Sequence, residues 1–408
     1  MTALAGTPVR KIIAAVADAA QRWSDADFPP RVRVTERIAQ RTRYAAPVVE
    51  YALDRLFFGI TAATIESTIR AELGSLEILD DFTRRDGRPD AWAAPAGRVC
   101  IISSRTTIGV AIVPAIFALC AKCDVLVKDR EDTLVGAFFD TLAEELDAFE
   151  GAAQATIWTA NDEHALSLGT FDAVVAFGTE QTLRAISRSI APGARLIGYG
   201  SRASAGYITR ESLRDTENAV RIAHGAARDL VLYETEGCLS LHTLFVERGA
   251  NVSLTEFGRI LSSAIEAANV EFPVGERSET HAAQIAQQRD LAAFRAAGGR
   301  GCVFASEKAE YAVIVDQPAT EPPYFLPRTI GIVAVDEPGG AVAYVREHCL
   351  RLEGFALSDD RSDAVQAAVQ AGAARLARFG DLQDPPLSGD HGGRPRIAEF
   401  VRWIDRTL

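Results

Sequence analysis

The pattern of apolar positions divides the chain into a helical beginning and a longer part in which strands and helices alternate. Before residue 90, apolar residues recur at helical spacing, as at Val9, Ile12, Ile13 and Val16. After Gly97, short apolar runs typical of buried strands alternate with amphipathic helices. We predict strands at 98–102, 124–128, 155–158, 172–177 and 194–198, with helices at 108–122, 133–149 and 180–189. This alternation predicts an α/β fold with a doubly wound parallel sheet, which binds ligands beyond the carboxyl ends of its strands.

A second α/β domain is predicted further along the chain. Its strands are expected at 241–246, 302–304, 311–315 and 330–335, and its helices at 212–230, 254–268 and 277–297. A helix at 362–379, a Pro/Gly-rich loop at 384–396 and a last amphipathic helix at 397–408 complete the chain.

We therefore expect four parts. They are an N-terminal helical layer (1–90), a nucleotide-binding domain (91–210), a second α/β domain that carries Cys238 (211–355) and a C-terminal segment (356–408). The last segment is expected to pack back onto the first domain or onto a neighbouring subunit.

Composition and charge narrow the function classes. The chain has 408 residues, of which 48% are hydrophobic and 24% charged, as in ordinary globular proteins. Its net charge of −12 argues against nucleic acid as the main partner, because phosphate binding needs a basic face. The longest apolar stretch, 107–127, is broken by Pro114, Lys122 and Asp124, so we expect no membrane span. The N-terminus lacks a secretory pattern, which predicts a cytoplasmic protein.

The cysteines supply one candidate for catalysis. Cys238 directly follows a glycine at the mouth of an apolar strand, where backbone N–H groups point outward and a thiol can meet a substrate. It is therefore our candidate nucleophile, and a small buried apolar residue is the alternative. Cys120 and Cys123 form a CxxC without a second such pair or a His cluster, so we expect no metal. Disulfides are not expected inside the cell.

Two predicted strand ends carry side chains suited to a nucleotide. Lys128, Arg130 and Glu131 follow one strand and offer cations and a carboxylate to phosphate and ribose. Gly178 and Thr179 stand at a helix N-terminus, where the helix dipole favours phosphate. Surface charges at a sheet edge are the alternative interpretation.

Four segments, in this order, resemble the LuxC-type fatty acyl-CoA reductases, a short branch of the aldehyde dehydrogenase superfamily. They are Gly97-Arg-Val-Cys-Ile-Ile-Ser-Ser-Arg-Thr-Thr-Ile-Gly109, Val125-Leu-Val-Lys128, Glu236-Gly-Cys-Leu-Ser-Leu-His242 with Phe245-Val-Glu247, and the tail from Gly380 through His391 to Val401-Arg-Trp-Ile-Asp405. The resemblance covers nearly the whole chain past the first helices. It implies an aldehyde dehydrogenase-like fold and NAD(P)H-dependent reduction of an acyl thioester to an aldehyde.

The resemblance also implies roles for single residues. Cys238 matches the acyl-accepting cysteine, and Lys128 matches the lysine that contacts the cofactor ribose, with Glu131 where a ribose-binding carboxylate often lies. Gly178 and Thr179 fall near the loop that faces the pyrophosphate. The family leans to NADPH, which Arg130 would suit through a 2′-phosphate, whereas Glu131 would favour NADH.

The sequence departs from the family pattern in three places. Thr106 stands where an asparagine is expected to hold the oxyanion, and Gly389 and Gly392 replace a tryptophan and an aspartate in the tail. The superfamily's Glu-Leu-Gly-Gly-Lys element, which supplies a hydrolytic base in aldehyde oxidisers, is represented by Gly198-Tyr-Gly-Ser-Arg202 without a carboxylate. This absence favours thioester reduction over aldehyde oxidation, although Glu234 and Glu236 lie nearby in sequence.

Two further functions stay open beside thioester reduction. One is an NAD(P)-dependent aldehyde dehydrogenase, and the other is a non-reducing partner protein that holds an acyl group on Cys238. The resemblance implies acyl-CoA or an acyl-carrier protein as the substrate and a homo-oligomer joined through the tail. His242, four residues past Cys238, is interpreted as structural because it leaves the turn on a strand.

Overall fold

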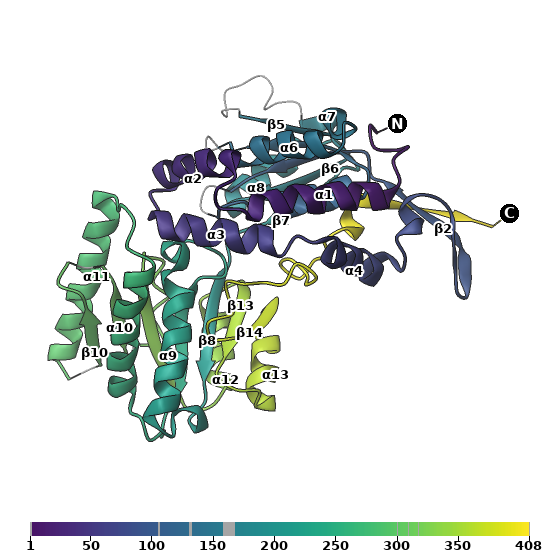
Figure 1. Cartoon of the computed structure of the whole chain (residues 1–408). Coiled ribbons are helices and arrows are strands. Elements are labelled where there is room, and N and C mark those ends of the chain that lie inside the picture. The colour runs from purple at the N-terminus through teal and green to yellow at the C-terminus, as the bar shows by residue number, and fades with distance from the viewer. Residues whose placement is uncertain are drawn as a thin grey trace. The chain divides into compact units, whose positions relative to one another are not determined.

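Two compact units make up the chain (Figure 1). The computed structural model describes residues 2–104, 107–129, 133–157, 168–299, 301–308, 310–316 and 318–407. The first unit comprises Met1–Thr42, Val49–Ser201 and Pro386–Leu408, and the second comprises Arg43–Val48 and Arg202–Pro385. The second unit is therefore formed almost entirely by a continuous segment that interrupts the first.

A five-stranded parallel sheet forms the centre of the first unit. Its strands are β3 (Arg98–Ile102), β4 (Asp124–Lys128), β5 (Ala153–Thr156), β6 (Ala173–Phe177) and β7 (Arg195–Tyr199), in the order β5-β4-β3-β6-β7. The helices between them are α5 (Ile112–Cys120), α6 (Leu134–Glu145), α7 (Phe149–Ala152) and α8 (Glu180–Ser187). Parallel strands buried on both faces need nearly continuous apolar residues, as all five buried positions of β6 show. The predicted α/β fold is confirmed.

Helices cover part of this sheet. They are α1 (Val9–Ser24), α2 (Pro29–Thr42), α3 (Ala46–Phe58) and α4 (Ala62–Leu73). The Trp23 ring is fully buried, 5.1 Å from the Phe57 ring and 6.2 Å from the Phe138 ring between centroids, and its Nε1–H donates to Thr141 Oγ1 at 3.0 Å. Because Phe138 and Thr141 belong to α6, Trp23 joins the N-terminal helices to the sheet layer.

The end of the chain forms a strand, so the predicted helix at 397–408 is wrong. After a short 3₁₀ turn, β15 (Val401–Arg406) pairs antiparallel with β2 (Arg88–Pro95), and β1 (Thr83–Arg85) completes a three-stranded sheet. Arg406 Nη2 lies 2.8 Å from Asp90 Oδ2. Pairing with a strand distant in sequence thus overrides the local helical period.

The second unit is built on a seven-stranded sheet. Its order is β10-β11-β12-β9-β8-β13-β14, and β10 is antiparallel to β11 while the other pairs are parallel. The strands are β8 (Ala203–Ile208), β9 (Leu241–Glu247), β10 (Cys302–Ala305), β11 (Ala312–Val315), β12 (Thr329–Val335), β13 (Leu352–Leu357) and β14 (Arg375–Arg378). The helices are α9 (Thr216–Val231), α10 (Leu254–Glu271), α11 (Glu279–Ala297), α12 (Gly339–Glu347) and α13 (Ser362–Gln370).

Several elements of the second unit differ from the sequence prediction, including β8 and α12, which were not expected. The predicted helix at 362–379 ends early, because Gly372 adopts φ 80° after α13 and the chain turns into β14. Strand β13 was not expected, although all six of its residues are buried between β8 and β14. Within the described ranges, each helix is too short or too polar to cross a lipid bilayer.

Candidate active site

Cys238 lies in a tight turn at the start of β9. The Ser240 N–H donates to Gly237 O at 3.0 Å, which closes the turn with Cys238 as its second residue. The Ser204 hydroxyl on β8 donates to Cys238 O at 2.8 Å and accepts the Gly354 N–H of β13 at 2.9 Å. The half-buried cysteine is therefore held by two neighbouring strands of the sheet.

The electrostatic surroundings of Cys238 favour the neutral thiol. Removal from water, helped by the Glu353 carboxylate, raises the pKa of the Cys238 thiol to about 12. The backbone N–H groups of Cys238 and Leu239 and the Arg202 guanidinium act in the opposite direction. These N–H groups therefore lie where they stabilise negative charge on the sulfur, although burial outweighs them in the unliganded protein.

We expect alkylation of Cys238 by iodoacetamide to accelerate about tenfold per pH unit between pH 7 and 10, because only the thiolate reacts. A thiol of ordinary pKa would reach a plateau near pH 9. The measurement is mass spectrometry of the peptide that contains Cys238, with the exposed Cys349 as the internal reference. A plateau for Cys238 below pH 9 would contradict the raised pKa.

An ion pair beside Cys238 was not predicted from the sequence. Arg202 Nη1 lies 3.3 Å from Glu353 Oε2, and the Glu353 side chain is buried. Arg202 belongs to the segment that stands in place of the superfamily's Glu-Leu-Gly-Gly-Lys element, whereas Glu353 lies on the unpredicted strand β13. A glutamate within an apolar run, as in Leu-Glu-Gly-Phe-Ala-Leu, is the signal that could have identified it.

Replacement of this carboxylate should make the thiol more reactive. In Glu353→Gln, Cys238 loses a negative neighbour and Arg202 loses its partner, so both changes lower the pKa of Cys238. We expect alkylation at pH 8 to accelerate about threefold to tenfold, by the order of magnitude of a neighbouring charge. Slower alkylation would instead indicate that Glu353 accepts the thiol proton.

The residues before Cys238 have a strained backbone. Tyr233, Glu234 and Thr235 adopt φ values of 56°, 52° and 62°, a left-handed conformation that costs about 1–2 kcal/mol for each non-glycine residue. Arg328, which is fully buried, holds this segment. Its backbone N–H donates to Thr235 Oγ1 at 2.9 Å, and its guanidinium pairs with the Glu234 carboxylate.

Further contacts fix the Glu234 carboxylate and the Arg328 side chain. Arg277 Nη2 lies 3.2 Å from Glu234 Oε2, and the Gly275 N–H donates to Glu234 Oε1 at 3.3 Å. Arg328 also donates to Phe272 O at 2.9 Å. Glu234 is thus committed to a structural ion-pair network and does not serve as a base for water.

His242 is a structural residue of the second unit. It is buried on β9, where its ring lies 4.9 Å from that of Phe325. Burial lowers the pKa of His242 to about 4, so the imidazole is neutral at physiological pH. A neutral ring supplies no positive charge to stabilise a Cys238 thiolate.

Residues predicted to bind the cofactor lie at the carboxyl ends of strands in the first unit. Lys128 ends β4, paired in register with Ile102 of β3 and Thr156 of β5. Gly178 and Thr179 follow β6 and lead into α8. Thr106, Arg130 and Glu131 lie outside the described residues.

The loop between β6 and α8 already uses several of its polar groups. The Gly178 N–H donates to Tyr199 O at 3.1 Å, and Thr179 Oγ1 accepts the Thr182 N–H at 3.2 Å as the N-cap of α8. Glu180 adds negative charge to the first turn. Several polar groups of this loop are thus committed to the fold itself.

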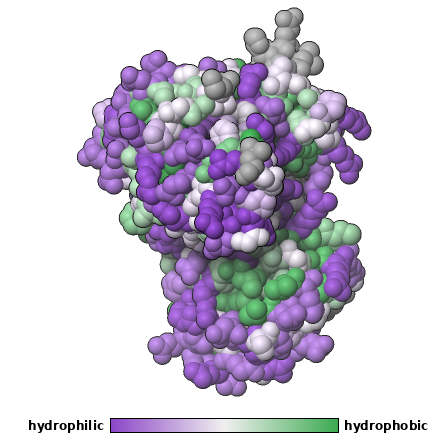
Figure 2. All heavy atoms as spheres, turned by 90° about the vertical axis from the view of Figure 1, so that its right-hand side faces the viewer, coloured by the Kyte–Doolittle hydropathy of each residue, from purple (hydrophilic) through white to green (hydrophobic). Residues whose placement is uncertain are grey.

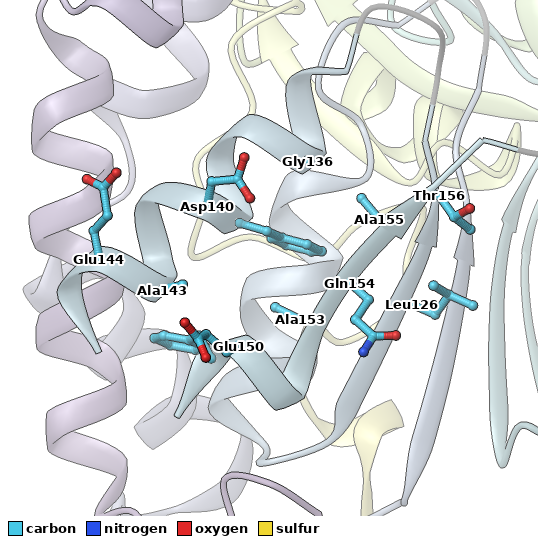
Figure 3. Close-up of a pocket in the computed structure, with 12 residues that line it drawn as sticks. Leu126, Gly136, Asp140, Ala143, Glu144, Glu150, Ala153, Gln154, Ala155 and Thr156 are labelled. Carbon is cyan, nitrogen blue, oxygen red and sulfur yellow. The ribbon is translucent and has the colours of Figure 1, made fainter. Parts of the chain in front are cut away.

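A groove of about 690 Å³ begins beside the end of β5 and follows α6 and α7 (Figure 3). Its lining includes Thr156, the register partner of Lys128, and the carboxylates of Asp140, Glu144 and Glu150. These carboxylates repel phosphate but accept hydrogen bonds from hydroxyl and amino groups.

The CxxC cysteines belong to the apolar core. Cys120 and Cys123 are buried, which raises their pKa values to about 12 and about 11. The Cys123 thiol donates to Phe400 O at 3.3 Å. Among the residues that the structure describes, no group of three His, Cys, Asp or Glu side chains has the arrangement of a metal site.

Comparisons with known proteins agree with this architecture. A family model described as acyl-CoA reductase (LuxC) matches residues 4–403. A search of curated proteins found no match.

Solved structures of aldehyde dehydrogenases share the fold at low sequence identity. An NAD-dependent benzaldehyde dehydrogenase from Corynebacterium glutamicum aligns with a TM-score of 0.71 and 15% identity, over 98% of this chain and 87% of that one. An oxidoreductase from Marinobacter aquaeolei gives 0.72 and 12%, over 97% and 84%. Glyceraldehyde-3-phosphate dehydrogenase GapN from Methanocaldococcus jannaschii, complexed with NADP, gives 0.70 and 11%, over 98% and 90%. The predicted aldehyde dehydrogenase-like fold is confirmed.

Proposed function

We propose that this chain, which belongs to the acyl-CoA reductase (LuxC) family, reduces an acyl thioester to an aldehyde through a covalent intermediate on Cys238. The observation that carries the role of Cys238 is its turn. The backbone N–H groups of Cys238 and Leu239 act on the sulfur, and the turn is tied to β8 and β13 through Ser204. The substrate is acyl-CoA or an acyl-carrier protein.

The first step transfers the acyl group to the cysteine. The Cys238 sulfur forms a bond to the thioester carbon, the bond from that carbon to the carrier sulfur breaks, and the cysteine proton leaves with the carrier thiol. One thioester replaces another, so the exchange is nearly balanced in energy and the protein mainly supplies position. The N–H of Cys238 holds the negative oxygen of the tetrahedral intermediate, and the family resemblance implies Thr106 as a second donor.

The second step releases the aldehyde. A reduced nicotinamide cofactor, when bound, supplies the hydride that the acyl carbon accepts. The carbon–sulfur bond to Cys238 then breaks, and a proton taken up from solvent restores the thiol. The residues proposed to hold the cofactor are Lys128, Arg130, Glu131, Gly178 and Thr179. The expected cofactor is NADPH, with NADH as the alternative.

The site disfavours the reaction of an aldehyde dehydrogenase that forms an acid. Such an enzyme needs a base to activate water for hydrolysis of the acyl-enzyme. Glu234 is occupied by Arg328 and Arg277, and Glu353 is paired with Arg202. Two of the nearby carboxylates are thus held in ion pairs. Glu236, whose pKa burial raises, is the candidate base for the dehydrogenase alternative.

A steady-state assay tests this function. The purified protein is mixed with NADPH, or separately NADH, and acyl-CoA thioesters from acetyl to palmitoyl, while nicotinamide absorbance and aldehyde are followed. We expect one aldehyde per cofactor oxidised, with NADPH preferred. Acid formation from an aldehyde and the oxidised cofactor would support the dehydrogenase. Acylation of Cys238 without cofactor oxidation would support a non-reducing acyl-handling protein.

We also propose a homo-oligomer, because each unit exposes apolar side chains beside a terminal strand. Strand β14 ends the seven-stranded sheet, with Leu376 38% exposed and Val369 of α13 59% exposed. Figure 2 shows apolar side chains gathered on the side of the second unit that carries these elements. Trp403 on β15 is 43% exposed. Terminal strands of this kind are usually covered. Light scattering is expected to give a mass of at least two chains.

A further inference from the structure

We propose that Gln383 is a positioning residue for the Cys238 turn, which it holds through Ser240, and that Asp229 keeps Gln383 in place. The inference rests on the proposed function, because it concerns the geometry of the same nucleophile. It adds Gln383, which lies 143 positions from Ser240 in sequence.

The loop 380–383 is attached to α9 through Asp229. Asp229 is fully buried on α9 and accepts the Gly380 N–H at 2.7 Å and the Leu382 N–H at 3.1 Å, one on each carboxylate oxygen. Burial raises the pKa of Asp229 to about 7, while the two N–H donors favour its ionised form. One carboxyl group therefore fixes the loop at two backbone positions.

Gln383 forms a hydrogen-bonded bridge between Asp229 and Ser240. Its Nε2 lies 3.1 Å from Asp229 O and 3.0 Å from Ser240 Oγ. Because a backbone carbonyl only accepts hydrogen bonds, the atom beside Asp229 O must be the amide nitrogen. The same nitrogen consequently donates to Ser240 Oγ, and the bridge has a defined direction from the loop to the turn.

Tight packing around this bridge leaves the loop 380–383 little freedom to move. Leu382 is fully buried, and a Cβ added to Gly354 would lie 2.6 Å from Leu382 Cδ1 and 3.2 Å from Leu239 Cδ2. A Cβ on Gly225 of α9 would lie 2.5 Å from the Phe379 carbonyl. Glycines are thus required where the loop approaches α9 and the turn.

These contacts fix both sides of the nucleophile. Ser204 holds the Cys238 carbonyl from β8, and Gln383 holds the Ser240 hydroxyl from the loop. The turn closes through the Ser240 N–H, so a shift of Ser240 also moves Cys238. Small misplacements of a nucleophile lower its rate strongly, by roughly a hundredfold for 1 Å.

The test compares Gln383→Leu, Ser240→Ala and the double variant. The readout is the single-turnover rate of Cys238 acylation, with the thioester in the acetyl- to palmitoyl-CoA series that acylates wild type fastest. We expect each single variant to lower this rate about fivefold to tenfold, as expected for loss of one hydrogen bond of about 1 kcal/mol. The double variant should be no slower than Gln383→Leu alone, since that change already removes the bond to Ser240 Oγ along with the bond to Asp229 O.

Two controls distinguish an effect on the position of Cys238 from a general loss of stability. Iodoacetamide alkylation at pH 9 should change less than about twofold, because a small reagent does not need the oriented turn. Ser262→Ala removes a different buried hydroxyl contact, the 2.8 Å bond to Tyr311, and should lower the thermal midpoint without slowing acylation.

Several outcomes would overturn the inference. Wild-type acylation rates in Gln383→Leu, multiplicative effects in the double variant, or an equal loss in Ser262→Ala would each do so while the proposed function stands. If no thioester acylates Cys238 in the wild type, the proposed function fails and the inference fails with it.

Discussion

Cys238→Ala is expected to lower the rate of aldehyde formation by at least about 10⁴-fold, because it removes the atom that carries the acyl group. The fold should be retained, since the side chain is small and half-buried and the turn is held by Ser204 and Ser240 through contacts that do not involve the sulfur. The measurement is aldehyde production with the preferred cofactor, together with circular dichroism.

The comparison variants for this experiment are Cys349→Ala and Cys238→Ser. Cys349 is exposed, so its replacement should leave the rate unchanged. Serine keeps the shape of the turn but supplies a far weaker nucleophile when no base activates it. If Cys238→Ala kept more than a tenth of the wild-type rate, another residue would have to accept the acyl group.

Arg328→Met should cause the largest loss of stability among single substitutions in the second unit. It leaves the buried Glu234 carboxylate without its main partner and removes the guanidinium's hydrogen bond to Phe272 O. Breaking a buried ion pair on one side costs about 3–5 kcal/mol. For a unit of this size, the thermal midpoint should fall by about 6–20 °C, which calorimetry measures.

A surface arginine provides the matched comparison. Arg214 is 76% exposed at its side chain and pairs with Asp215 at 3.3 Å. Arg214→Met should change the stability by less than about 1 kcal/mol, because exposed pairs contribute little. A similar loss in both variants would mean that burial of Arg328 is not what makes its pair important.

The sequence indicated the sheet of the first unit and the candidate nucleophile because both depend on local pattern. Strand β6 is a run of five apolar residues bounded by Asp172 and Gly178, and the Gly237-Cys238 pair stands immediately before an apolar strand. The family motifs lie in these same short segments.

The particular residues and strands that meet across the chain were not predicted, although the tail was expected to pack back onto the first domain or a neighbouring subunit. Glu353 and Gln383 meet the turn only because β13 and the loop 380–383 fold beside it. Strand β15 forms because β2 offers it a partner about three hundred residues away in sequence, as the separation of 316 between Arg406 and Asp90 shows. No period or propensity within such a segment encodes its distant partner.

The interrupted connectivity of the first unit has a consequence for biosynthesis. The ribosome completes Arg202–Pro385 before it makes β15, which β2 needs as its neighbour. The second unit can thus form its sheet while the first still lacks a strand, and domains generally fold as units during synthesis. During that interval β2 presents an unpaired edge on the nascent chain, so the first unit is the part most exposed to aggregation until β15 has been synthesised.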